Sequence, residues 1–312
     1  MTAILTTAGG EKWQMPALLE WEFLRTDGSS CDSARFTFLY EPKRVEVLKK
    51  ATRFQLTEDS KTVLCGVVDE FTASVGPGGR LVTVTGRGMA ALLMDNELRA
   101  AEYALLQKED ALNRFARDFG VVVGPSGSFP AVRNFAVGTG LTAWKALCGF
   151  CRHSKNARPR FTADGTLLPD GGTAGQWELT ANSAFRSFTL RQYRYGVISR
   201  QLMLSARSGL QEDRENAAFK ALGGSAVKVG MKQDKYTPAG WRNAAQCIED
   251  SMEEAVLLTV TMAGRQEAEP GDRVAVYWSE QGVTGTYTLR SRRECYDGRE
   301  RTCTLELKGV LG

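Results

Sequence analysis

The stretch Leu-Cys-Gly-Phe-Cys-Arg-His, which begins at residue 147, holds a Cys-x-x-Cys pair and the only histidine of the chain. Cys148 and Cys151 have the spacing found in redox-active dithiols, in zinc sites and in haem attachment. His153 is the only imidazole available as a general base. These three side chains are the first candidates for chemistry.

The position of the pair disfavours all three kinds of site. At helical spacing, Cys148 and Cys151 share an apolar stripe with Leu141, Trp144 and Leu147, in the last turns of a predicted helix. Redox thiols sit at a helix N-terminus, where the dipole lowers their pKa. Zinc would need two further ligands, but the sequence has no second cysteine pair of this kind and no second histidine. Haem attachment needs histidine directly after the second cysteine, where the sequence has arginine.

We therefore expect Cys148 and Cys151 to be buried packing thiols, and His153, just past the helix, to face solvent. The alternative is a soluble thiol-dependent redox enzyme centred on the two cysteines. That alternative requires at least one thiol of lowered pKa, because the thiolate is the reactive form.

A second candidate motif is Gly86-x-Gly88-x-x-Ala91, which follows a strand and opens a helix as a dinucleotide fingerprint does. The preceding strand alternates apolar residues with threonine, whereas the first strand of a dinucleotide-binding fold is buried on both faces. No alternation of strands and helices follows. We expect two glycines that end a strand, and no nucleotide cofactor.

Other catalytic patterns are missing from the sequence, including Gly-x-Ser-x-Gly, the Walker loop and His-Glu-x-x-His. The acidic pairs Asp69-Glu70 and Glu253-Glu254 read as solvated surface. Basic residues cluster at 186–200, 228–242 and 290–301; they could touch phosphate, but a solvated sheet face or a subunit contact fits better. We expect a protein that is not an enzyme, with no catalytic residues, metal or cofactor.

Composition sets the class of protein. Of the 312 residues, 43% are apolar and 24% are charged, which predicts a folded chain with a core. The net charge of +4 is below that of a dedicated nucleic-acid binder. The N-terminus lacks a signal-peptide pattern, and no apolar run approaches the length of a membrane helix. We expect synthesis in the cytoplasm, and seven scattered cysteines that remain free thiols.

The order of predicted elements suggests a β-rich α+β protein in three parts. Residues 1–95 form a first β-domain of short alternating strands, with a hairpin turn at 76–79. Residues 96–185 form a small α+β unit, with helices predicted at 89–101, 108–120 and 142–153 and a hairpin turning at Asp164-Gly165. Residues 186–312 form a second β-domain. It contains a polar loop or arm at about 209–240 and a helix over 240–258, with Trp241, Ala244, Ala245, Ile248 and Met252 on one side.

The two β-domains share a pattern. Gly66 precedes the turn at Gly79-Arg80 by thirteen residues, and Gly285 precedes the turn at Gly298-Arg299 by the same number. Any two hairpins can look alike in this way. The alternative is two related β-domains in one chain, flanking the α+β unit.

Residues 269–309 are similar to the closing barrel of phage tail hub proteins of the late control protein D family. That family shows a Gly-Asp turn, a Gly-x-Tyr strand start and a hairpin that ends in Thr-x-x-Leu-x-Leu. Residues 63–88 resemble its first barrel, and residues 142–168 resemble the helix-plus-hairpin unit of hubs from prophage-type contractile tails of Gram-positive bacteria. The matching C-terminal residues are Gly271, Asp272, Val274, Gly285, Tyr287, Asp297, Gly298, Thr302, Leu305 and Leu307.

This resemblance implies two antiparallel, tail-tube-like β-barrels flanking the α+β domain, in a non-enzymatic virion structural protein. Such hubs are homotrimers that present six barrels to the six-fold tail tube and adapt it to the three-fold spike, with strands continuing across subunits. The implied partners are the tail tube protein, a spike or cell-puncturing protein, other baseplate proteins and the tape-measure protein; nucleic acid would be only passing cargo in the lumen. The chain would be made in the bacterial host cytoplasm and assembled into the tail of a phage, a bacteriocin-like particle (tailocin) or an injection system. Segment 209–240 would contact a neighbouring tail component.

Overall fold

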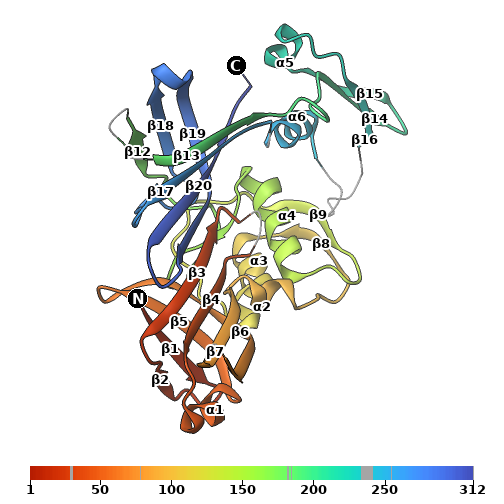
Figure 1. The fold of residues 1–312 in the computed structure, drawn as a ribbon. Helices are drawn as coiled ribbons and strands as arrows, with labels where there is room; N and C mark the ends of the chain where they lie inside the picture. Colours follow the sequence, from red (N-terminus) through yellow and green to blue (C-terminus); the bar gives the residue numbers. More distant parts are fainter. Residues whose placement is uncertain are drawn as a thin grey trace.

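A computed structural model describes residues 1–28, 31–77, 79–180, 183, 185–232, 242–253 and 255–311. Two antiparallel sheets lie at opposite ends of the molecule, and a small unit of helices and short strands packs beside the point where they meet (Figure 1). The predicted β-rich α+β class is confirmed.

The first sheet has the strand order β3-β4-β7-β6-β5-β1-β2, with antiparallel neighbours throughout. Alternating apolar residues point inward along these strands and build a core that includes Phe23, Phe36, Phe54 and Val84. The elements are β1 (Thr2–Thr7), β2 (Lys12–Gln14), β3 (Leu18–Thr26), β4 (Ser33–Leu39), α1 (Pro42–Leu48), β5 (Ala51–Glu58), β6 (Lys61–Gly76) and β7 (Gly79–Gly88).

The second sheet has the order β13-β17-β20-β19-β18-β12, and only the pair β12–β18 is parallel. Its core is centred on Trp278, Val260 and Leu305. The elements are β12 (Gln176–Leu179), β13 (Phe185–Gln192), β17 (Val256–Ala263), β18 (Arg273–Trp278), η2 (Ser279–Gln281), β19 (Val283–Tyr296) and β20 (Arg301–Gly309). The sheet thus takes β12 from the range 96–185 that the sequence assigns to the α+β unit, and the three-part division stays a prediction.

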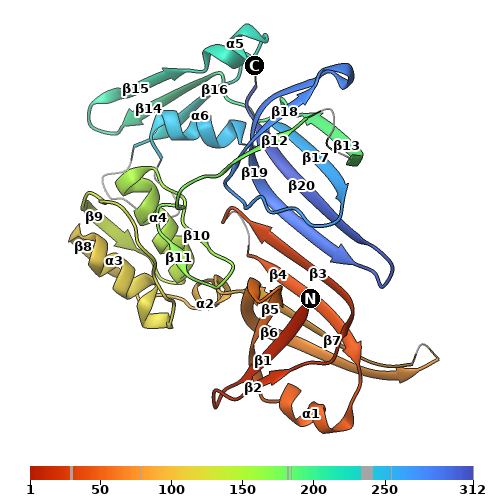
Figure 2. The same cartoon turned by 90° about the vertical axis from the view of Figure 1, so that its left-hand side faces the viewer.

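One strand pair joins the two sheets. The second half of β19, Ser291–Tyr296, pairs antiparallel with Trp21–Thr26 of β3, so the thirteen strands form one continuous hydrogen-bonded sheet (Figure 2). The main path of this sheet begins at β13 and ends at β2. The sequence patterns did not predict this pairing of segments about 270 residues apart.

The small unit lies against both sheets. Helix α3 (Lys108–Phe115) and helix α4 (Ala143–Lys155) form as predicted, and Gly120 ends the first of these segments with a left-handed φ of 75°. The helix predicted at 89–101 forms only as α2 (Ala91–Met94); residues 95–100 are not helical, and Ala101 begins strand β8 (Ala101–Leu106), which pairs with β9. The remaining elements are η1 (Arg117–Phe119), β9 (Val132–Val137), β10 (Arg160–Phe161) and β11 (Leu167–Leu168), the last two forming the predicted hairpin.

The polar loop or arm expected at about 209–240 contains strands where it is described. Strands β14 (Arg200–Ser205), β15 (Gly209–Glu215) and β16 (Val227–Met231) form a three-stranded sheet, with α5 (Ala217–Ala221) between two of them. Residues 233–241, with Trp241, lie outside the described residues. The sequence pattern did not indicate these strands, because their composition is polar and much of their surface faces solvent.

Helix α6 (Ala244–Met252) is shorter than predicted and begins at a capping box made by Asn243 and Gln246. It ends at Met252 because Val256 starts β17, and Ala245, expected on the apolar side, is exposed.

The two sheets repeat one topology. The orders β3-β4-β7-β6-β5-β1 and β13-β17-β20-β19-β18-β12 correspond strand for strand, and they differ in direction only at the last pair. In each sheet, the pairing of strands skips one residue at the same two places. These irregularities lie at Leu18–Glu20 and Phe185–Ser187, and at Val68–Glu70 and Leu289–Ser291.

A side-chain contact repeats as well. The hydroxyls of Thr37 and Thr83 are 3.0 Å apart across β4 and β7, and those of Thr261 and Thr304 are 3.3 Å apart across β17 and β20. This match favours two related β-domains over a chance likeness of hairpins.

The matched irregularities also correct the glycine register. Asp69 and Arg290 are the skipped residues of equivalent strands, so Gly66 corresponds to Tyr287. The equivalence of Gly66 with Gly285, inferred from the turn glycines, is therefore two residues off.

Candidate functional site

Helix α4 places the Cys-x-x-Cys pair where the sequence predicted it. Thr142 caps the first turn by accepting a hydrogen bond from the Lys145 backbone N–H, and Asn156 ends the helix in the left-handed region. Cys151 is fully buried and Cys148 packs against the same core, which also contains Leu147. The pair is thus at the electrically negative end of the helix.

Burial governs the chemistry of these thiols. It raises the pKa of Cys148 to about 12 and raises the pKa of Cys151 well above its usual value. Both therefore stay protonated at neutral pH and are poor nucleophiles. Within the described part of the chain, no group of three or more His, Cys, Asp or Glu side chains could hold a metal ion. All seven cysteines are free thiols, and the geometry does not support a redox enzyme.

Replacing both cysteines, as in Cys148→Ala with Cys151→Ala, should leave the fold intact and cost on the order of 1 kcal/mol for each methyl-sized void. In the unaltered native protein, iodoacetamide at neutral pH should leave Cys148 and Cys151 unlabelled by peptide mass spectrometry. The urea-unfolded protein, in which both should react, is the control. Rapid labelling of Cys148 in the native state would contradict the packing role.

His153, which was expected to face solvent, is half-buried. Its ring lies edge-on to Phe135 with centroids 6.5 Å apart, and burial lowers the pKa of His153 to about 4. The imidazole is therefore neutral at physiological pH. Its placement depends on strand β9, which carries Phe135 and which the sequence patterns did not predict.

A charged cavity of about 440 Å³ opens beside the last turns of α4. Arg152 bonds Asp250 of α6 at 2.7 Å, and Arg158 pairs with Glu253. Lys308 of β20 lies 3.1 Å from Glu253 and 2.6 Å from Asp27 at the end of β3. These mutually paired charges connect the α+β unit, helix α6 and both sheets.

Glu253 makes this cluster sensitive to acid. Burial alone would raise the pKa of Glu253, but Arg158 and Lys308 outweigh it and lower the pKa from 4.5 to about 2. A lowered folded-state pKa stabilises the protein above the unfolded value, and this stability is lost as the pH falls towards 2. Glu253→Gln should therefore lower the free energy of unfolding at neutral pH by at most about 3 kcal/mol and flatten its decline in acid.

Urea unfolding at several pH values measures this effect. Glu249→Gln, which alters an exposed carboxylate of the same helix, should leave the acid decline nearly unchanged. An equally steep decline in the Glu253→Gln and unaltered proteins would show that the cluster does not contribute.

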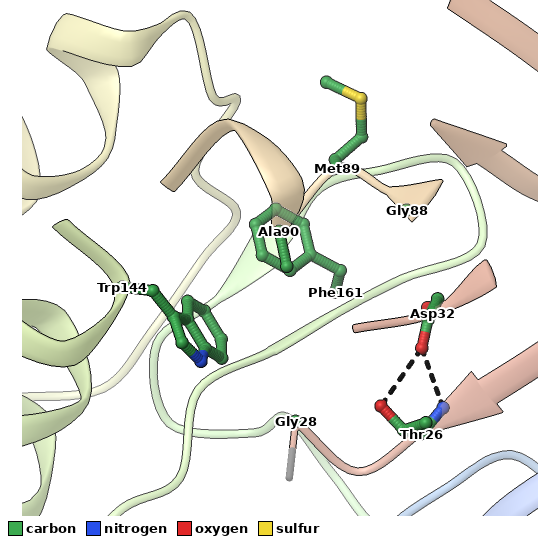
Figure 3. A pocket seen from close by; sticks show the side chains of 8 residues that line it. All are labelled: Thr26, Gly28, Asp32, Gly88, Met89, Ala90, Trp144 and Phe161. Carbon is green, nitrogen blue, oxygen red and sulfur yellow. Dashed lines mark hydrogen bonds between the residues drawn. The ribbon is translucent and has the colours of Figure 1, made fainter. Parts of the chain in front are cut away.

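The glycines of the fingerprint-like motif serve close packing. A Cβ on Gly86 would lie 2.6 Å from the Phe54 ring, and one on Gly88 would lie 2.8 Å from Cβ of Asp32. The adjoining cavity, lined in part by Gly88, Trp144 and Phe161, measures about 10 Å³ (Figure 3). Such a volume holds about one water molecule, which is far too small for a dinucleotide.

The remaining charged candidates form ion pairs. Asp69 makes two hydrogen bonds of 2.8 and 2.9 Å to Arg87, while Glu70 is exposed, so the two do not form a carboxylate dyad. Glu254 lies outside the described residues. In the basic clusters, Arg186 pairs with Glu300 and Arg200 pairs with Asp213.

The joint between the sheets contains a buried arginine that sequence reasoning missed. Arg25 is 1% exposed and donates to Asp32 at 2.9 Å, to the Phe161 carbonyl at 2.9 Å and to the Val63 carbonyl at 3.3 Å. It also lies 3.4 Å from Glu269, in the loop between β17 and β18 of the second sheet. One guanidinium thus ties together both sheets and the small hairpin.

Arg301 extends the joint. It donates to Glu58 of β5 at 2.7 and 3.0 Å and also pairs with the buried Glu294. The sequence signal for the joint is the alternation in β3, where Trp21, Phe23 and Arg25 share one face and place a charge in an apolar row. The joint sets the arrangement of the two sheets, and it is the feature of the molecule best suited to a structural role.

No protein-family model matches the chain, and no curated protein matches its sequence. Solved structures match over nearly the whole length. A tail protein from Neisseria meningitidis MC58 is 17% identical, with a TM-score of 0.75 over 99% of this chain and 96% of that one. The 43 kDa tail protein of prophage MuSo2 from Shewanella oneidensis is 14% identical, with a TM-score of 0.74 over 98% and 97%.

The chain has the fold of phage tail proteins. A third match is the E. coli c3393 protein, a component of the type VI secretion system described as structurally similar to the T4 tail proteins gp27 and gp5. It is 13% identical, with a TM-score of 0.57 over 98% of this chain and 76% of that one. The predicted resemblance to phage tail proteins is thus confirmed at the level of the fold. None of the helices in the described segments is long and apolar enough to cross a membrane.

Proposed function

We propose that this chain is the structural hub of a phage or phage-like tail baseplate. Three copies form a ring that adapts the six-fold tail tube to the three-fold spike, without catalytic activity or a cofactor. The observation that carries the proposal is the repeated strand order of the two sheets within one chain. The shared fold with tail proteins supports it.

The repeat accounts for a change of symmetry. Three chains with two equivalent sheets each present six similar units on one face, as a six-fold tube requires. On the other face, three copies of the remaining parts can meet a trimeric spike. Head-to-tail contacts between identical chains close into such a ring when the rotation fits.

The proposed partners follow from this position in the tail. They are the tube protein on one side, a spike on the other, further baseplate proteins and the tape-measure protein, with nucleic acid only as cargo passing through the lumen. The particle is a phage tail, a bacteriocin-like tail or an injection system, and the match to a type VI secretion component is compatible with the last.

The three-stranded sheet of β14, β15 and β16, within the segment expected to form an arm, supplies a further contact surface. Leu210, Val227, Val229 and Met231 of β15 and β16 are between 54% and 60% exposed, an apolar patch that free surfaces rarely keep. We propose that it docks on a neighbouring tail component.

Light scattering of the purified protein tests the ring. We expect a particle of three chains of 34.2 kDa each at high concentration, and the same chain in isolated tail particles. A protein that stays monomeric at all concentrations and is absent from such particles would overturn the proposal.

A further inference from the structure

The charged cavity beside α4 has the size of a small-molecule site. Its volume of about 440 Å³ falls within the range of about 300–1,000 Å³ that ligand pockets span. Its walls come from the end of α4 and the loop after it, from Arg242 and the end of α6, and from Asp27 and Gly28 after β3. A ligand held there would contact three segments that are far apart in the chain.

Three arginines converge on one carboxylate in this cavity, that of Asp250 near the end of α6. Its oxygens lie 2.7 Å from Arg152, 2.9 Å from Arg242 and 3.6 Å from Arg158. Each guanidinium has N–H donors on all three nitrogens, whereas one carboxylate offers about four acceptor sites. Asp250 therefore cannot satisfy the three guanidinium groups, and donors remain for a further acceptor.

The other buried carboxylates of the cavity do not remove this excess. Glu253 pairs with Arg158 but also with Lys308, and Asp27 lies 2.6 Å from Lys308. Among the described residues, Arg242 pairs with Asp250 alone. Arg242 is thus the guanidinium whose donors are least occupied.

The charges are arranged by depth. The side chains of Arg242 and Arg158 are 59% and 41% exposed, whereas those of Asp250 and Asp27 are 20% and 8% exposed. The carboxylates therefore lie inside, and the guanidinium groups lie nearer to solvent. A ligand that enters from solvent meets positive charge first, which favours an anion.

The wall formed by α4 carries no negative side chain. Cys148 is a neutral thiol, because burial raises its pKa to about 12, and His153 is a neutral imidazole, because burial lowers its pKa to about 4. Gly149 has no side chain to fill the space between them. The partial negative charge at the end of this helix is offset by Arg152 in its last turn.

We propose that this cavity binds a small anion with several phosphate or carboxylate oxygens, held by Arg152, Arg158 and Arg242. Planar guanidinium groups bind either kind of oxyanion through paired N–H donors. The bound anion joins α4, α6 and the end of β3, and it stabilises their arrangement, because a ligand that binds only the folded state favours that state. The site lies within one chain and is independent of the proposed ring.

Isothermal titration calorimetry with pyrophosphate and with citrate, at neutral pH and constant ionic strength, tests the site. We expect one anion bound per chain. Arg242→Gln should weaken binding at least about tenfold, because charge-assisted hydrogen bonds are lost while only an exposed side chain is changed. Arg186→Gln is the matched control, since it removes a cation that is 43% exposed on β13, and it should leave the affinity unchanged.

His153 shows where the anion binds. Protein made with isotope-labelled histidine and without a histidine tag should give one imidazole resonance, because the chain has a single histidine. This resonance should shift in step with calorimetric saturation. At the same anion concentration it should shift far less in Arg242→Gln. The measurement on the unaltered protein stands even if the variant fails to fold, which circular dichroism checks.

The two anions distinguish the source of the oxygens. Tighter binding of pyrophosphate assigns the site to phosphate compounds, and tighter binding of citrate assigns it to carboxylates. Binding of neither anion, equal binding by Arg242→Gln and the unaltered protein, or saturation without a shift of His153 would overturn the proposal. Each of these results leaves the hub proposal standing, since that proposal is tested by the oligomeric state.

Discussion

Arg25→Ala is expected to lower the free energy of unfolding by about 3–5 kcal/mol, because it leaves a buried carboxylate without its cation. Asp32 is almost fully buried, and Arg25 donates to it at 2.9 Å. The change also leaves the Phe161 and Val63 carbonyls without this donor. Urea unfolding followed by circular dichroism measures the loss.

The pH dependence identifies the cause. Burial raises the pKa of Asp32 above 3.8, and Arg25 opposes that rise. Without Arg25 the folded-state pKa of Asp32 should rise further, because only the protonated carboxyl tolerates burial without a cation. A raised folded-state pKa gives stability that is present in acid and lost as the pH increases. The deficit of Arg25→Ala should therefore be smallest near about pH 4 and largest at neutral pH.

Two further variants control for the lost side chain. Arg117→Ala removes a cation that is 42% exposed and paired with Glu109, and it should cost about 0–1 kcal/mol. Adding Asp32→Asn to Arg25→Ala should recover part of the loss, since the unpaired charge is then gone. A deficit that is independent of pH and is not relieved by Asp32→Asn would assign the effect to packing alone.

Local patterns were enough to predict most elements of the fold. Alternation identified β3 to β7 and β18 to β20, and helical spacing identified α3 and α4, because one face of each is buried against a core. Patterns failed where a distant strand decides the structure. Ala101–Leu106 has helix-forming residues, yet it pairs with β9.

The candidate site shows the same limit. The position of Cys148 and Cys151 on their helix was enough to predict inert thiols, because the dipole and the apolar stripe are local properties. The partial burial of His153 was not predicted, because part of its environment is Phe135 on a separate strand. Arg25 was missed because its hydrogen bond to Phe161 and its ion pair with Glu269 join it to residues far along the chain.

The repeat shows that β3 has a partner strand on one edge, whereas the same edge of its equivalent β13 is open. A sheet that ends in an open edge needs an intermolecular partner or protection against aggregation. Within this chain β3 finds β19, and the equivalent β13 keeps an exposed leucine in place of a buried phenylalanine. The position of β13 then depends on how firmly the core of the second sheet holds that strand.

Trp278→Ala should show that dependence. Trp278 is 1% exposed, its ring lies 4.5 Å from that of Phe185 and 5.5 Å from that of Phe188, and its indole N–H donates to the Thr180 carbonyl at 2.9 Å. Removing a buried tryptophan leaves a cavity and should lower the free energy of unfolding by about 3–5 kcal/mol.

The same substitution should loosen β13, because Phe185 and Phe188 are the residues that hold this strand on the core. Native-state hydrogen exchange should therefore be faster in Phe185–Gln192 of Trp278→Ala than in the unaltered protein, under conditions where the protein remains folded. Tyr277→Ala is the matched control, since Tyr277 is the preceding residue of β18, is 54% exposed and points to the opposite face. It should change neither stability nor the hydrogen exchange of β13 appreciably. Unchanged exchange in β13 of a destabilised Trp278→Ala protein would mean that Trp278 does not hold this strand on the core.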